Sequence, residues 1–188
     1  ARFEQIYLRD LLARPERFDA VSFVSVLHEF YAYGQGISSV LKALGDAHEL
    51  LRLNGEIVIR DMILFEYTKH TRFQVEAIAK KVFAQRAKRK YVRDFEARFG
   101  KLRSLYTFNH FLLKYFYTDN WAHECAEHYV PVTFEQYEQI FQLLGMDLQL
   151  KDSYLIPFLR KQWQRDFDLT EAELVGLRSP GFLVARKA

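Results

Sequence analysis

The sequence predicts an α/β fold with a largely parallel sheet, and three stretches between residues 18 and 64 lead to that prediction. Ala20 to Leu27 is an apolar run, rich in β-branched and aromatic residues, with the length of a strand buried on both faces. A helical pattern follows, and then a second strand, Glu56 to Asp61. Strand, helix and strand form a right-handed crossover unit, which binds ligands at the carboxyl ends of its strands. The polar residues at those ends are His28, Glu29, Arg60 and Asp61.

The helix between the two strands is predicted from the spacing of its apolar residues. These residues recur three and four positions apart between Ile37 and Leu53, as on one face of an amphipathic helix. They are Ile37, Val40, Leu41, Leu44, Ala47, Leu50 and Leu51. Asn54 and Gly55 follow, and we expect Gly55 to take the left-handed conformation that ends the helix.

Composition and length narrow the class of protein. A chain of 188 residues with 49% hydrophobic residues forms one domain with an elaboration. Its single cysteine, Cys125, excludes an intramolecular disulfide and a cysteine metal cluster. No apolar run approaches the roughly 20 residues that span a bilayer, and the first residues lack the apolar core of a signal peptide. We therefore expect a cytoplasmic protein that does not bind membranes.

The charge distribution separates a helical segment, residues 65–130, from the sheet-forming residues 1–64 and 131–188. Between Lys69 and Arg103 there are twelve Lys or Arg and three acidic residues. This is a local balance of +9, against +3 for the whole chain, which leaves the rest at −6. This basic stretch is predicted to be helical, and a second helical stretch, Ser104 to Tyr117, is rich in aromatic residues. We expect residues 65–130 to be an insertion that covers or extends the site.

Residues 131–188 are expected to complete the sheet. Thr133 is a good N-cap for an amphipathic helix that ends at Gly145. Met146 to Ile156 is a predicted strand, and Gly181 to Arg186 is the last one. Trp163 to Leu177 is expected to be a polar connection with one short helix. Two strands at the end of a chain pair most easily in antiparallel fashion.

Four stretches resemble the class I S-adenosylmethionine-dependent methyltransferases. RDLL followed by FDAV resembles the end of the family's third strand and the start of its fourth, and VLHEF resembles the fourth strand's end. ELLRLNGEIVIRD is similar to the next helix and the fifth strand, and TFEQYEQIFQLLGMDLQL with GFLVARK to the last helix and the sixth and seventh strands. The resemblance implies a Rossmann-like methyltransferase sheet of parallel strands with an antiparallel C-terminal strand, and a helical insertion after the fifth strand.

The family's glycine-rich first loop and the acidic residue after its second strand have no counterpart in these 188 residues. Both would precede Ala1. We expect the first two strands to belong to a preceding segment of a longer polypeptide. The alternative is a half-domain that does not bind the cofactor by itself.

The resemblance also implies roles for individual residues around S-adenosylmethionine. The Asp10 carboxylate would accept a hydrogen bond from the adenine amino group, and Leu11 would pack near the ring. Ser25 and Val26, at the end of the fourth strand, would contact the cofactor as well. The alternative for Asp10 is an ordinary residue at a strand end that stabilises a turn.

His28 is the expected general base, as in the plant-type small-molecule O-methyltransferases that the motif resembles. An imidazole there removes a proton from a hydroxyl near neutral pH; the alternative is a histidine that only hydrogen-bonds backbone. Glu29 is expected to orient His28 or to bind a substrate amine. Further substrate contacts are expected from Tyr31, Tyr33, Arg60 and Asp61, although the last two are also placed to form ion pairs at the sheet rim.

These features together predict an S-adenosylmethionine-dependent methyltransferase that acts on an oxygen or nitrogen of a small molecule, under a helical lid. One alternative is an RNA-directed methyltransferase that binds nucleic acid through Lys80 to Arg103. A second is a non-catalytic binding or scaffold protein whose basic insertion engages RNA or a partner chain. Another is a different nucleotide-binding enzyme of doubly wound fold. The run His123 to His128 (HECAEH) has the wrong spacing for a metal site, so we expect a solvated helix and no metal. The oligomeric state is left open.

Overall fold

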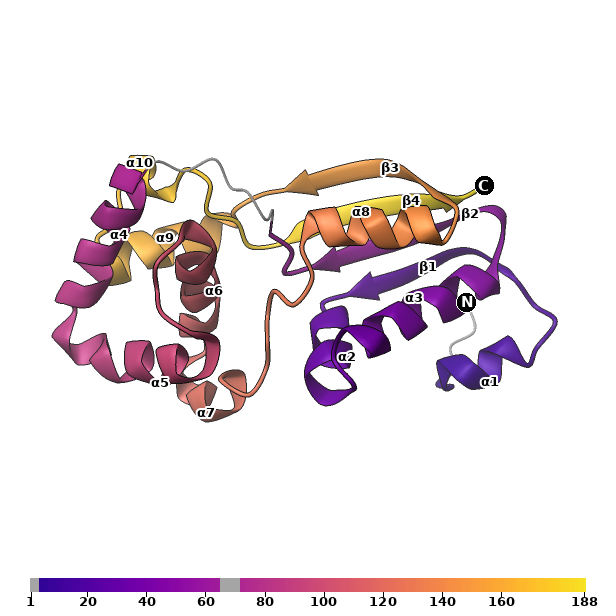
Figure 1. The fold of residues 1–188 in the computed structure, drawn as a ribbon, viewed down its shortest axis with the longest axis horizontal. Helices are drawn as coiled ribbons and strands as arrows, with labels where there is room; N and C mark the ends of the chain where they lie inside the picture. The colour runs from indigo at the N-terminus through magenta and orange to yellow at the C-terminus, as the bar shows by residue number, and fades with distance from the viewer. Residues whose placement is uncertain (1–3, 65–71) are drawn as a thin grey trace.

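The computed structural model describes residues 4–64 and 72–188 as a four-stranded mixed sheet beside a helical body (Figure 1). The strands are β1 (Phe18–Val24), β2 (Leu51–Asp61), β3 (Met146–Ser153) and β4 (Gly181–Lys187). Their order is β1-β2-β4-β3, with β1 parallel to β2 and with β4 antiparallel to both β2 and β3. The predicted sheet, parallel strands with an antiparallel C-terminal strand, is confirmed.

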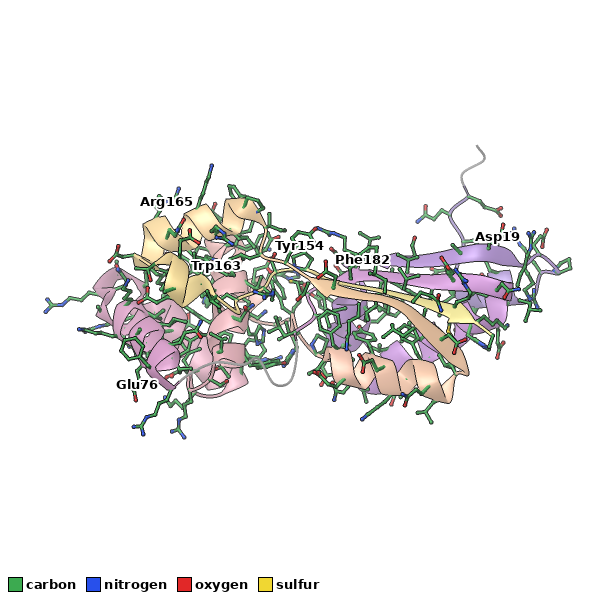
Figure 2. The ribbon with its side chains drawn as sticks, turned by 90° about the horizontal axis from the view of Figure 1, so that it is seen from above. Asp19, Glu76, Tyr154, Trp163, Arg165 and Phe182 are labelled. Carbon is green, nitrogen blue, oxygen red and sulfur yellow. The ribbon has the colours of Figure 1, made fainter. Side chains whose placement is uncertain are left out.

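Two helices cover one face of this sheet. They are α3 (Ile37–Leu50) and α8 (Phe134–Leu143), and Figure 2 shows both on the same side of the strands. Their apolar residues pack against β1, β2 and β4 in one core cluster. Thr133 begins α8 in a reciprocal capping box with Gln136, and Gly145 follows the helix with φ +67°, as the sequence predicted.

The prediction that β1 is buried on both faces is wrong. Phe23 is the only fully buried residue of this strand, and Val24 is 56% exposed. The reason is that β1 forms an edge of the described sheet, and that α3 and α8 cover only one face.

The joint between α3 and β2 also differs from the prediction. The helix ends at Leu50, and β2 begins at Leu51 because its first residue pairs with Phe18. Asn54, with φ +63°, takes the left-handed conformation that was expected of Gly55. Gly55 is required for close packing instead, since a Cβ there would lie 3.0 Å from the Arg52 carbonyl oxygen.

The strand expected before β1 is a helix. Helix α1 (Leu8–Leu12) packs against α3, beside the end of the sheet where β1 begins (Figure 1). The backbone N–H groups of Asp10 and Leu11 donate to the Tyr7 carbonyl oxygen at 2.9 and 3.2 Å. The segment therefore satisfies its backbone locally and does not pair with a strand.

The helical body has its own hydrophobic core and draws on two segments of the chain. The first supplies α4 (Arg72–Ala84), the 3₁₀ turn η1 (Arg86–Lys88), α5 (Arg89–Phe99), α6 (Leu105–Tyr115), the 3₁₀ turn η2 (Thr118–Asn120) and α7 (Trp121–Glu124). The second supplies α9 (Pro157–Phe167) and α10 (Glu171–Leu174). Trp163 of α9 is fully buried in this core, so the connection from Trp163 to Leu177 is not the polar linker expected. None of the helices in the described ranges is both long and apolar enough to cross a bilayer.

Candidate active site

A cavity of about 570 Å³ lies where the carboxyl ends of β1 and β2 meet the helical body. Helix α2 (Leu27–Tyr33), which follows β1, brings His28 and Glu29 to its wall, and β2 brings Arg60 and Asp61. The other wall comes from the helical body and from the connections that flank it. The aromatic residues on that wall are Phe116, Tyr117, Tyr129 and Phe158. This is the sheet edge at which parallel strands bind ligands.

Asp61 holds His28 in one orientation. Its Oδ1 accepts a hydrogen bond from His28 Nδ1 at 2.7 Å and another from the Met62 backbone N–H at 2.8 Å. Its Oδ2 accepts from the backbone N–H groups of Leu27 and His28, at the first turn of α2. Because the carboxylate only accepts, the proton of the neutral imidazole lies on Nδ1 and the lone pair on Nε2. The strand end thus caps the helix and fixes the histidine tautomer.

The electrostatic surroundings of His28 favour its protonated form. Burial has the largest single effect and lowers the pKa. The hydrogen bond from Nδ1 to Asp61 and the charges of Asp61, Glu127 and Glu29 together outweigh it, so the pKa of His28 is raised above 6.5. An imidazole with these neighbours is suited to accept a proton near neutral pH.

Glu127 faces His28 from the other wall of the cavity. Its Oε2 lies 4.0 Å from His28 Nε2. Its Oε1 accepts a hydrogen bond from the Tyr33 hydroxyl at 2.5 Å and lies 3.3 Å from His123 Nε2. The bond to Glu127 and burial raise the pKa of Tyr33 to about 12, so the phenol keeps its proton and donates to Glu127. This network holds the carboxylate beside the imidazole.

Lys114 fixes the segment that carries Glu127. Its ammonium is fully buried, donates to the backbone carbonyl oxygens of Glu124 and Glu127 at 2.5 and 2.6 Å, and lies 3.8 Å from the centre of the Tyr129 ring. Burial lowers the pKa of Lys114 to about 8. The solvated helix expected at His123 to His128 is therefore wrong: α7 ends at Glu124, and Glu124 and Glu127 are each only 8% exposed.

Comparison with known proteins gives similarity at the level of solved structures. No family model and no curated protein matches the chain. It is similar to a protein described as a sarcosine dimethylglycine methyltransferase from Galdieria sulphuraria, at 9% identity and a TM-score of 0.40, over 95% of this chain and 57% of the other. A protein described as a methyltransferase from Bacillus halodurans gives 14% identity and a TM-score of 0.38, over 95% of this chain and 69% of the other.

Half of the ten predicted site residues meet at the cavity. Ser25, His28, Glu29, Arg60 and Asp61 line it, and the Arg60 guanidinium lies 3.4 Å from the Ser25 hydroxyl oxygen. The contact that orients His28 comes from Asp61, whereas Glu29 was expected to make it. Asp61, which was expected to form an ion pair at the sheet rim, instead accepts the hydrogen bond from His28.

Two predicted substrate residues have other positions. Tyr33 acts on the cavity through its hydrogen bond to Glu127. Tyr31 packs against the His128 ring, with the ring centres 5.8 Å apart, and is not part of the cavity wall.

The predicted adenine contacts do not reach the cavity. Asp10 and Leu11 belong to α1, which lies at the opposite end of β1 from α2 (Figure 1). The Asp10 side chain is 53% exposed and lies 3.6 Å from the Arg9 guanidinium. Val26 precedes α2 and lines a separate, shallow groove with Phe30 and Tyr33. The residues expected at the adenine end of S-adenosylmethionine therefore lie away from the cavity that His28 and Asp61 line.

Two important residues were missed by reasoning from the sequence. Glu127 is four residues after His123, a spacing that places both side chains on one face of a helical turn. Lys114 is a lone cation within the apolar stretch FLLKYF, which is the pattern of a buried, hydrogen-bonded lysine. Among the described residues, no group of three or more His, Cys, Asp or Glu is placed to hold a metal ion.

Proposed function

We propose that this chain carries the acceptor site of an S-adenosylmethionine-dependent methyltransferase that acts on an oxygen or nitrogen of a small molecule. The observation that supports it most is the His28–Asp61 pair at the carboxyl ends of two parallel strands, with the imidazole at the wall of a cavity. The volume of that cavity, about 570 Å³, is in the range of small-molecule sites.

S-adenosylmethionine, when bound, supplies a methyl group that is already activated by its sulfonium. The protein must then align the acceptor and take up its proton. His28 Nε2 accepts that proton, and Asp61 stabilises the resulting imidazolium through Nδ1. The aromatic residues on the opposite wall of the cavity provide apolar surface for the acceptor to pack against.

Calorimetric binding of S-adenosylhomocysteine tests this proposal. The titration is run on the 188-residue chain and on the full-length gene product. Micromolar binding by either form supports a methyltransferase, and His28→Ala then serves as the control in a methyl-transfer assay, with binding of S-adenosylhomocysteine retained. Absence of binding to both forms contradicts it.

A second candidate function, binding of single-stranded RNA, is favoured by a basic groove between α4 and α5. The groove has a volume of about 630 Å³, and its residues include Phe83, Arg86, Arg89, Lys90 and Arg93. Within the described ranges, its three arginines form no salt bridge, in contrast to the Lys90–Asp94 pair at 2.6 Å. Phe83 is 43% exposed at the groove. Cations with an accessible aromatic ring suit a phosphate backbone and its bases.

Fluorescence anisotropy with a labelled RNA oligonucleotide distinguishes this candidate. Binding that weakens steeply with added salt, and that is lost in the triple variant Arg86→Ala, Arg89→Ala, Arg93→Ala, would favour an RNA-directed enzyme or an RNA-binding scaffold. Binding that the triple variant retains would assign the RNA contact to another surface.

A further inference from the structure

The cavity at His28 is acidic, although the chain as a whole has a net charge of +3. Four carboxylates line it, from Glu29, Asp61, Glu124 and Glu127, and Arg60 is the only lysine or arginine among the lining residues. Building on the proposed function, we propose that the site selects a protonated amine as its methyl acceptor, in preference to an alcohol or a phenol.

The spacing between His28 and Glu127 distinguishes a nitrogen from an oxygen. His28 Nε2 and Glu127 Oε2 lie 4.0 Å apart, too far for a hydrogen bond with each other. In the neutral state of His28 both atoms are acceptors. A single ligand atom at about 2.8 Å from each would donate to both. The directions to the two acceptors would then meet at about 90°, so each hydrogen bond bends by about 10° from the tetrahedral N–H directions. An amine has enough N–H groups to do so, whereas a hydroxyl has one hydrogen and satisfies only one acceptor.

The available oxygen of Glu127 is already directed at this position. Its Oε1 is occupied by the Tyr33 hydroxyl and lies near His123. Its Oε2 receives no hydrogen bond from any of the residues that the structure describes, and Glu127 is 8% exposed. This oxygen is free to accept a hydrogen bond, and its attraction for a cationic donor is strengthened because the residue as a whole is largely removed from solvent.

Glu124 provides an independent indication. It is 92% buried by exposed area, lines the same cavity, and its Oε2 has no hydrogen-bond partner among the described residues. Burial, followed by the charge of Glu127, raises the pKa of Glu124. The nearby cation Lys114 does not satisfy this oxygen, because its ammonium is bonded to the backbone carbonyls of Glu124 and Glu127. A ligand ammonium is the missing positive charge.

The aromatic wall also suits an alkylammonium group. The rings of Phe116 and Tyr117 lie 4.5 Å apart, and those of Phe116 and Phe158 lie 5.4 Å apart, both in edge-to-face contact. Aromatic faces attract cations and pack against alkyl groups. The Tyr129 ring already stacks with Lys114, which leaves the other three for a ligand.

The same arrangement provides for the proton that an ammonium must lose before its nitrogen reacts. One N–H bond breaks, its proton passes to Nε2 of His28, and the electron pair stays on the nitrogen. A second N–H stays hydrogen-bonded to Glu127, which orients that electron pair. His28 and Glu127 thus have different roles, one as base and one as the group that binds the cation.

Binding of a matched pair, benzylamine and benzyl alcohol, tests the inference without methyl transfer. Titrations followed by NMR at neutral pH give a Kd for each compound. We expect the amine to bind the native chain at least about tenfold more tightly than the alcohol. Glu127→Gln should abolish that preference by weakening the binding of the amine at least about tenfold. The matched control Glu49→Gln, which removes an exposed carboxylate of α3 that does not line the cavity, should retain the preference.

Equal affinities, a preference for the alcohol, or binding of neither compound by the native chain would overturn the inference. Circular dichroism establishes that each variant is folded, and Glu124→Gln, expected to reduce the preference, replaces Glu127→Gln if the latter does not fold. S-adenosylhomocysteine is titrated into the same samples. If the chain prefers the amine but does not bind S-adenosylhomocysteine, the proposed function is contradicted and the cation site is supported. If it binds S-adenosylhomocysteine but does not prefer the amine, only the cation site is contradicted.

Discussion

The acidic cavity and the basic groove use charge in opposite ways. In the cavity, Asp61 is 3% exposed and accepts four hydrogen bonds, so one geometry is fixed before any ligand arrives. In the groove, Arg86, Arg89 and Arg93 are exposed and form no salt bridge within the described residues. Buried charges interact strongly and with defined orientation, whereas exposed ones are weakened by solvent and salt. Chemistry is therefore expected at the cavity, and salt-sensitive association at the groove.

Replacing His28 should produce the largest effect. His28→Ala removes the base from the cavity, and we expect methyl transfer to fall by about 10²- to 10⁴-fold. The measurement is kcat with a radiolabelled methyl donor, with S-adenosylhomocysteine binding as the control. A native rate in this variant would show that His28 is not the base. The cavity would then no longer be distinguished from the groove as the place of the chemistry.

Asp61→Asn should lower stability more than the substitution of any exposed residue. An amide cannot accept all four hydrogen bonds that the carboxylate accepts, so we expect a loss of about 1–3 kcal/mol in the free energy of unfolding. Urea denaturation measures this loss. The matched control is Asp19→Asn, whose side chain is 85% exposed and pairs with Arg52, and which should change stability by less than about 0.5 kcal/mol. Equal losses of stability in the two variants would contradict the conclusion that the hydrogen bonds of Asp61 fix the geometry of the cavity.

Lys114 should make the free energy of unfolding depend on pH in the alkaline range. Burial lowers the pKa of Lys114 from 10.5 to about 8 in the folded chain. Between these two values the unfolded state binds more protons at this residue, so its contribution makes stability rise with pH over that interval. Lys114→Met should remove this rise, as measured by denaturation across the interval. An unchanged slope would show that Lys114 is not desolvated.

Changes in the groove should have the smallest effect on stability. Arg89→Ala removes an exposed side chain without a salt bridge in the described ranges, so the free energy of unfolding should change by less than about 0.5 kcal/mol. Thermal denaturation checks this expectation. A larger loss would indicate that the arginine packs against the helical core, and the groove would then be structural.

Sequence patterns predicted the elements whose apolar spacing is regular. Helices α3 and α8 and the strands around them follow from such spacing, and the capping box at Thr133 marks a boundary correctly. The segment before β1 was misread because a short apolar run is compatible with either strand or helix, and its contacts decide between them. β1 was expected to be buried on both faces because an apolar run does not show whether its strand lies at the edge of the sheet, as β1 does.

The candidate site was predictable only where residues follow strand ends. His28 and Asp61 were placed at one sheet edge by the crossover unit, but their hydrogen bond depends on the exact position of α2. Glu127 joins the site through Tyr33, which is 94 residues away in the sequence, and Lys114 acts through backbone carbonyls. Contacts of this kind leave no local periodicity, so the sequence placed His28 and Asp61 at the site and missed Glu127 and Lys114.

Long-range ¹H–¹⁵N NMR of the His28 ring tests the central claim most directly, because it reports the tautomer, the pKa and ligand contact together. Isotope-labelled chain is titrated with pH and then with benzylamine. We predict a proton on Nδ1, a pKa of His28 above 6.5, and a shift of the Nε2 resonance when benzylamine is added. A proton on Nε2 in the neutral ring, or an Nε2 resonance that benzylamine leaves unchanged, would contradict the assignment of His28 as the base of an amine-binding site.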